Sequence, residues 1–90
     1  MQMLKYLVEF VGTFIFLSVI LTSGEAIPIG IALAAVILFG GHISGGNFNP
    51  AVSISMLLQN KLSHSDTMAY IVAQIAGAIA AVMFVRMHKK

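Results

Sequence analysis

Few side chains of this sequence could do chemistry, and the clearest of them follow a glycine-rich run. Asn49 precedes Pro50 and a short apolar segment that reaches Leu58. Asn is a favoured helix N-cap and Pro is favoured at the first helical position, so a helix is predicted to start here. Capping needs the amide oxygen of Asn49 and leaves its NH2 group free to donate hydrogen bonds. His42 lies in the same run, and Glu9 is a carboxylate inside an apolar stretch.

The composition indicates the solvent in which these residues fold. Of the 90 residues, 59% are hydrophobic and 9% are charged, and the mean hydropathy is +0.97. Ordinary globular chains carry roughly 25% charged residues, and a soluble domain of this size could not hide so much apolar surface. We therefore expect an integral multi-pass membrane protein that contacts lipid and binds no nucleic acid. We expect no enzyme activity, no cofactor and no metal.

Three apolar stretches could position the candidate residues as membrane helices. A spanning helix needs about 20 residues, with a range of about 17–25. The first and third stretches fit this length, and the second is short unless flanking residues extend it. The predicted fold is a single all-α domain, residues 1–90, with spanning helices over about 3–22, 26–41 and 67–85.

Residues 42–58, between the second and third helices, are predicted to re-enter the membrane. A helix from Pro50 to Leu58 would be about 13 Å long, under half of the hydrocarbon core of about 30 Å. The polar residues that follow would return the chain to the side from which it entered. Non-helical backbone at membrane depth is tolerated only where it is buried in protein or lines a wet cavity. The segment therefore indicates a pore, with an ordinary surface loop as the alternative.

The run from Gly41 to Val52, GHISGGNFNPAV, resembles the first signature loop of the aquaporins, the major intrinsic protein family. The segment 9–14 is similar to that family's first-helix motif, and the segment 73–78 resembles its third helix. The resemblance covers the whole chain in order, but it matches only the first of the family's two repeats. Family members have six spanning helices and two Asn-Pro-Ala half-helices, built as inverted repeats.

The resemblance implies a role for each residue of the loop. Asn49, Pro50 and Ala51 would form the pore motif, with the amide of Asn49 directed at passing water. Two such groups, each at the positive end of a half-helix, would orient water and repel cations. The implied pore-lining residues are His42, Gly45 and Gly46, where glycine lets backbone carbonyls form the wall. For His42 a purely structural role is an equal alternative.

Other positions would support the loop or set the solute filter. Glu9 is implied to be a buried acceptor that braces the re-entrant loop, and Gln74 is given a similar role. The expected constriction residues are Ile29, Ile37 and Val52. The first stands where the family has a pore-facing aromatic residue, and the other two match the filter His and Arg of the second repeat. Their apolar character puts water-only selectivity in doubt.

One copy would form half of a pore wall, so a second half is required. Lys5 and Lys61 are expected on one membrane face, opposed by Arg86, Lys89 and Lys90 on the other. Orientation follows the Lys/Arg bias of short flanks, and this near balance favours insertion in both orientations. The predicted assembly is an antiparallel homodimer or a larger oligomer, including a tetramer of pores, that conducts water and small neutral solutes such as glycerol.

The sequence also fits three alternatives. The chain could be a fragment that needs another aquaporin half, although the basic end resembles a true terminus. It could be a non-conducting subunit that modulates full-length relatives. It could also be a small dual-topology exporter, for which Glu9 would be the only candidate carboxylate within the membrane.

Overall fold

The computed structural model describes residues 2–89, and these residues form an all-helical fold. The helices are α1 (Gln2–Ser23), α2 (Ala26–Ser44), α3 (Pro50–Leu58) and α4 (His64–His88). By length and composition, α1, α2 and α4 could each cross a membrane, whereas α3 has only nine residues. The predicted fold class, three apolar helices and one short helix, is confirmed.

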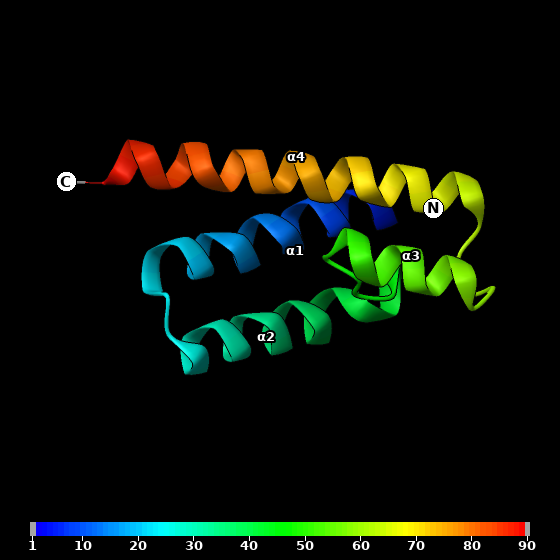
Figure 1. Cartoon of the computed structure of the whole chain (residues 1–90), viewed down its shortest axis with the longest axis horizontal. Helices are drawn as coiled ribbons and strands as arrows, with labels where there is room; N and C mark the ends of the chain where they lie inside the picture. The colour runs from blue at the N-terminus through cyan, green and yellow to red at the C-terminus, as the bar shows by residue number, and fades with distance from the viewer. Residues whose placement is uncertain (1, 90) are drawn as a thin grey trace.

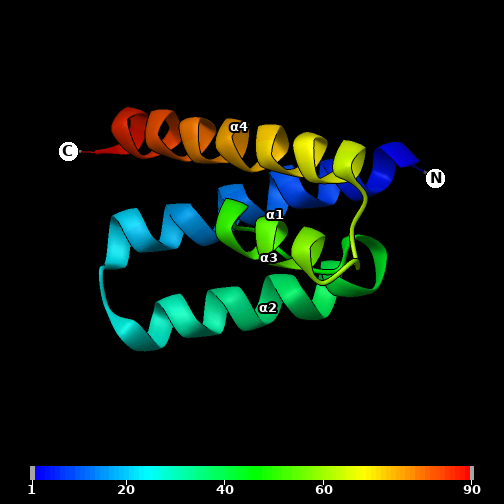
Figure 2. The same ribbon diagram turned by 45° about the vertical axis from the view of Figure 1, so that its right-hand side comes forward.

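The re-entrant path of the chain is visible in the arrangement of the helices (Figure 1). Helices α1 and α2 are antiparallel and joined by a tight turn, and α4 lies along α1. The segment between α2 and α3 turns back along the molecule, and α3 then returns to the end from which the segment came. Figure 2 shows the same path of the chain after rotation of the view.

Three helix ends differ by three residues from the ranges expected for the spans, and one of them is the end of α4, at His88 instead of residue 85. Helix α2 continues to Ser44, three residues past the expected end, because the chain leaves the helix only at Gly45. Gly45 has a φ of 92° and donates its backbone N–H to Gly41 O at 2.8 Å, which is a left-handed C-cap. Helix α4 begins three residues early, at His64, because Ser63 Oγ accepts the N–H of Asp66 at 3.0 Å.

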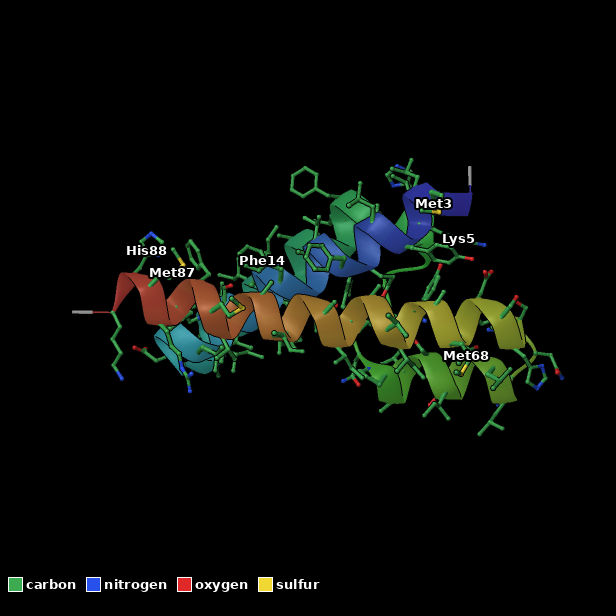
Figure 3. The ribbon with its side chains drawn as sticks, turned by 90° about the horizontal axis from the view of Figure 1, so that it is seen from above. Met3, Lys5, Phe14, Met68, Met87 and His88 are labelled. Carbon is green, nitrogen blue, oxygen red and sulfur yellow. The ribbon has the colours of Figure 1, made fainter. Side chains whose placement is uncertain are left out.

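Helices α1 and α4 pack closely because small residues face the contact. Gly77 and Ala81 of α4 are buried, and Ala81 has no exposed surface. A Cβ placed on Gly77 would lie 2.7 Å from the carbonyl oxygen of Phe10, which leaves no room for a side chain. Farther along the same interface the rings of Phe14 and Phe84 meet edge to face, with centroids 5.5 Å apart (Figure 3).

An ion pair joins α1 to α4 at the end where both helices start. Lys5 Nζ lies 2.6 Å from Asp66 Oδ2, and Tyr6 OH donates to Asp66 Oδ1 at 2.6 Å. Figure 3 shows Lys5 at this end and His88 at the opposite end of the molecule. Lys61 lies in the connection between α3 and α4, just before the start of α4, whereas Lys90 is outside the described residues.

Within residues 2–89, α3 packs on α4 and does not pack against α1 or α2. One face of the short helix is consequently uncovered. Ala51, Ile54, Ser55 and Leu58 are exposed and recur at the spacing of a single helical face. The outer surface is also apolar: the side chain of Phe39, for example, is 81% exposed. Such a surface suits lipid or another apolar partner.

Candidate functional site

The carboxylate of Glu9 is the centre of the polar network that holds the loop between α2 and α3. Its Oε2 accepts hydrogen bonds from Ser44 Oγ at 2.7 Å and from Asn47 N at 3.0 Å. Its Oε1 accepts from Phe48 N and from Gln74 Nε2, both at 2.8 Å. Glu9 has no exposed surface, so its four bonds satisfy a fully buried carboxylate and connect three helices to the loop.

Ser53, on α3, is the second residue at which several hydrogen bonds of the network meet. Its hydroxyl oxygen accepts hydrogen bonds from Asn47 Nδ2 at 3.0 Å and from Gln74 Nε2 at 2.8 Å. Gln74 therefore touches both the α1 carboxylate and the short helix. Tyr70, one turn earlier on α4, donates its OH to the carbonyl of Ser44 at 2.6 Å. These contacts attach the end of α2, the loop and the start of α3 to one face of α4.

Phe48 is the residue that turns the chain from the loop into the short helix. It has a φ of 55°, which L residues other than Asn and Asp seldom adopt, and its side chain is 2% exposed. The ring lies against Gly12 of α1, where an added Cβ would come within 2.1 Å of Phe48 Cε1. The conformation is thus held by a backbone bond to Glu9 on one side and by ring packing on the other.

Asn49 caps α3 through its oxygen. Its backbone is extended, its Oδ1 accepts the N–H of Ala51 at 2.8 Å, and Pro50 occupies the first helical position. The residue is exposed, and among residues 2–89 no acceptor takes a hydrogen bond from its NH2 group. The structure therefore presents amide donors at the positive end of a short helix dipole, an arrangement that can bind the oxygen of a neutral solute.

A cavity of about 370 Å³ adjoins this helix start, between α1 and α4. Asn49 and Pro50 line it together with Thr13, Phe48 and Gln74, and the rest of its wall is apolar. Thr13 Oγ1 and Gln74 Oε1 are buried and have no hydrogen-bond partner among the described residues. The cavity thus combines an apolar wall with a few polar groups, which is the usual make-up of a small-molecule site.

The remaining expected site residues are partly brought together. Ile37 lies beside the loop, because a Cβ added to Gly46 would be 3.5 Å from Ile37 Cγ1. His42 is exposed in the last turn of α2, and Val52 is half-buried on α3. Ile29 is half-buried in the first turn of α2, at the far end of that helix. Since α2 and α3 do not pack together within residues 2–89, neither isoleucine is held against Val52 by this chain.

Several residues of the network were not among the sequence expectations. They are Ser44, Asn47, Ser53 and Tyr70, together with Phe48. A signal was available on α4, since Tyr70 and Gln74 precede the small residues Gly77 and Ala81 on the same helical face. For the loop residues there was none, because a polar residue next to glycines reads as an ordinary turn.

Groups of His, Asp and Glu side chains that could bind a metal ion are absent from residues 2–89, and the sequence has no cysteine. The profile of the major intrinsic protein family matches residues 20–90.

Individual relatives agree with the family match. The chain is 46% identical over 89 residues to "Glycerol uptake facilitator protein-like 6" of Lactiplantibacillus plantarum, covering 88% of this chain and 41% of that protein. It is 40% identical over 57 residues to the lens fiber major intrinsic protein of Gallus gallus, covering 63% and 22% of the two chains. An aquaglyceroporin of Rhizobium meliloti is 43% identical over 56 residues, covering 62% and 24%. No solved structure matches the chain.

Proposed function

Because this chain belongs to the major intrinsic protein family and is an integral membrane protein, we propose that it is a passive channel subunit for water and small neutral solutes such as glycerol. The observation that carries the proposal is the free NH2 group of Asn49 at the start of α3. A hydrogen-bond donor at a helix N-terminus binds a neutral oxygen and disfavours a cation. The relatives named for glycerol support glycerol as a candidate solute.

The path of the solute would follow the loop. Gly45 and Gly46 lie at its start, where backbone carbonyls can accept hydrogen bonds from water, and Ile37 lies close to Gly46. His42 would stand at the inner entrance, where it is exposed. Asn49 would then receive the solute at the tip of the short helix. Acceptors followed by a donor provide alternating partners for a single file of water molecules.

A second half is needed, because the chain spans 41% of the length of the Lactiplantibacillus relative that it matches. The exposed face of α3 and the unpacked space between α2 and α3 leave one side of the proposed path open. An inverted second copy would place another Asn49 opposite the first. The near balance of Lys and Arg at the two ends is compatible with such dual insertion. The alternative partner is another aquaporin half.

The proposed constrictions are apolar. Ile29, Ile37 and Val52 would supply the narrow parts, and apolar walls bind water poorly and can gate by dewetting. We therefore expect modest water conduction and tolerance of small neutral solutes. Fast water transport with complete exclusion of glycerol would contradict this assignment and would require the filter to come from another chain.

The test is the permeability of proteoliposomes that contain only this protein. Water and glycerol fluxes are measured for wild type, for Asn49→Asp and for the matched control Asn60→Asp in the exposed α3–α4 turn. We expect Asn49→Asp to lower water flux and to admit cations, because donors are replaced by a negative charge. Wild-type vesicles no more permeable than empty ones would reject a homomeric channel. Conduction restored only with another aquaporin half would support the alternative partner.

Orientation is measured separately. A reporter fused after α4 should be found on both sides of the membrane in comparable amounts. Adding positive charge near Lys61, with Gln59→Lys and His64→Lys, should bias insertion to one orientation and reduce flux. A single orientation in the wild-type protein would reject the antiparallel homodimer.

A further inference from the structure

A second cavity shares one lining residue, Phe48, with the first. This outer groove, of about 350 Å³, runs between α1 and α2, and its wall is made entirely of apolar residues. They include Leu7, Val11, Ile15, Val36 and Phe39. The inner cavity, described above, contains Asn49 together with the polar groups of Thr13 and Gln74. Polar side chains therefore line only the inner cavity, although most of its wall is also apolar, and the side chain of Phe48 lines both spaces.

We propose that the ring of Phe48 is the wall that seals the inner cavity from the outer groove and thereby fixes the direction of Asn49. The part of this inference that concerns solute selectivity rests on the proposed channel function, whereas the sealing role does not. Phe48 would act as a positioning residue: it does not bind the solute itself, but it fixes the orientation of Asn49, which does.

The ring of Phe48 leaves no space for a side chain on α1 at Gly12, and it lies at ordinary contact distance from α2 at Gly40. A Cβ on Gly12 would lie 2.1 Å from Phe48 Cε1, so only glycine at position 12 admits the ring. A Cβ on Gly40 would lie 3.5 Å from Phe48 Cζ, which is ordinary contact. With 2% of its surface exposed, the ring fills the slot between the two helices. A smaller side chain would leave the slot open.

The fixed backbone conformation of Phe48 determines the position of the next residue, Asn49. A φ of 55° is sparsely populated for a Phe and persists only where the surroundings impose it. Here the N–H is bound to Glu9 Oε1 at 2.8 Å and the ring is held in its slot, so both sides of the Cα are fixed. The next residue is Asn49 in its extended capping conformation. Without the ring, the strained turn can relax and the amide can move away from the inner cavity.

The first experiment measures the seal without reference to conduction. The sequence has no cysteine, so Thr13→Cys supplies a single thiol in the wall of the inner cavity, at a position that is 3% exposed. Its reaction with N-ethylmaleimide, which is membrane-permeant, is followed in vesicles. We expect slow labelling when Phe48 is present and labelling several-fold faster when Phe48→Ala is added. Equal labelling rates would overturn the sealing role, whatever the channel conducts.

The second experiment measures positioning through the ratio of glycerol to water permeability and through cation leak. We expect Phe48→Ala to change the ratio and to raise the leak above that of wild type. The double variant Phe48→Ala with Gly12→Leu refills the slot from α1 and should restore both values toward wild type. Phe39→Ala, which enlarges the outer groove without opening the wall, should change neither.

The outcomes separate the two proposals. If wild-type vesicles conduct nothing, the channel proposal fails while the thiol experiment still decides the seal. If wild type conducts and Phe48→Ala, inserted at the same level, retains its ratio without leak, the positioning role is overturned. It is equally overturned if both permeabilities fall in proportion and the refilled variant brings no recovery, since that result describes a residue needed only for folding.

Discussion

Replacing Glu9 with Gln is the sharpest perturbation of the network, because it removes a charge without changing shape. The amide oxygen of the new side chain can take the place of Oε1 and keep the bonds from Phe48 and Gln74. Its NH2 group then faces Ser44 and Asn47. The Ser44 hydroxyl can rotate to accept, but the backbone N–H of Asn47 cannot. If the NH2 group instead replaced Oε1, it would face two donors, the N–H of Phe48 and the amide of Gln74. The placement with the amide oxygen at the Oε1 position is therefore preferred.

The expected cost follows from this arrangement. One buried N–H loses its acceptor, which costs about 1–3 kcal/mol, and the surviving bonds weaken from about 1.5–3 to about 0.5–1.5 kcal/mol each when the charge is lost. Relief of the desolvation of a buried charge offsets part of this loss. The net destabilisation of Glu9→Gln is therefore on the order of 2–4 kcal/mol.

The assay is unfolding by SDS in mixed micelles, followed by loss of helical circular dichroism. Glu25→Gln is the matched control, because Glu25 is exposed at the α1–α2 turn and its side chain makes no cap hydrogen bond. Exposed substitutions of this kind usually lie within about 0.5 kcal/mol of wild type. If the two variants unfold at the same SDS fraction, Glu9 does not hold the loop as the hydrogen bonds indicate.

Three further predictions follow from the packing and the proposed path. Gly77→Ala should force α1 and α4 apart and destabilise by about 1–3 kcal/mol, whereas Gly30→Ala, with open space around it, should be neutral or stabilising in the same SDS titration; equal midpoints would refute the close contact. Tyr70→Phe should lose the bond to the Ser44 carbonyl and cost about 1 kcal/mol, and an unchanged midpoint would count against it. Val52→Arg should suppress cation leak and lower glycerol flux in vesicles, and unaltered fluxes would place position 52 outside the path.

The elements of the fold were largely predictable because each rests on a local signal. Apolar length identified the three long helices, and the Asn49–Pro50 pair identified the start of α3. The end of α2 was misjudged at residue 41, since the glycine that ends the helix is Gly45 rather than the first glycine of the run. Several glycines close together predict that the helix ends among them, but they do not show which glycine ends it.

The site was predictable only where a side chain was out of place in its local sequence. Glu9 and Gln74 are polar within apolar helices, and the family resemblance implied that both brace the re-entrant loop. Their partners could not be derived in the same way, because Ser44 and Ser53 are small polar residues that helices often contain without any role. Phe48 looked like one more apolar residue. Its importance depends on the slot at Gly12, 36 positions away, and on a backbone angle that composition does not reveal.

The return of α3 to its own side has a consequence for covalent linkage. Because the short helix contributes no crossing, the chain traverses the molecule an odd number of times, and α4 ends opposite the start of α1 (Figure 1). If a second copy were joined directly after α4, its first helix would enter from the far side. Every element would then be upside down relative to the first copy, with no added crossing helix. A tandem duplication would thus give inverted symmetry automatically, and a short linker after α4 would fix the pairing that separate copies must reach by inserting both ways.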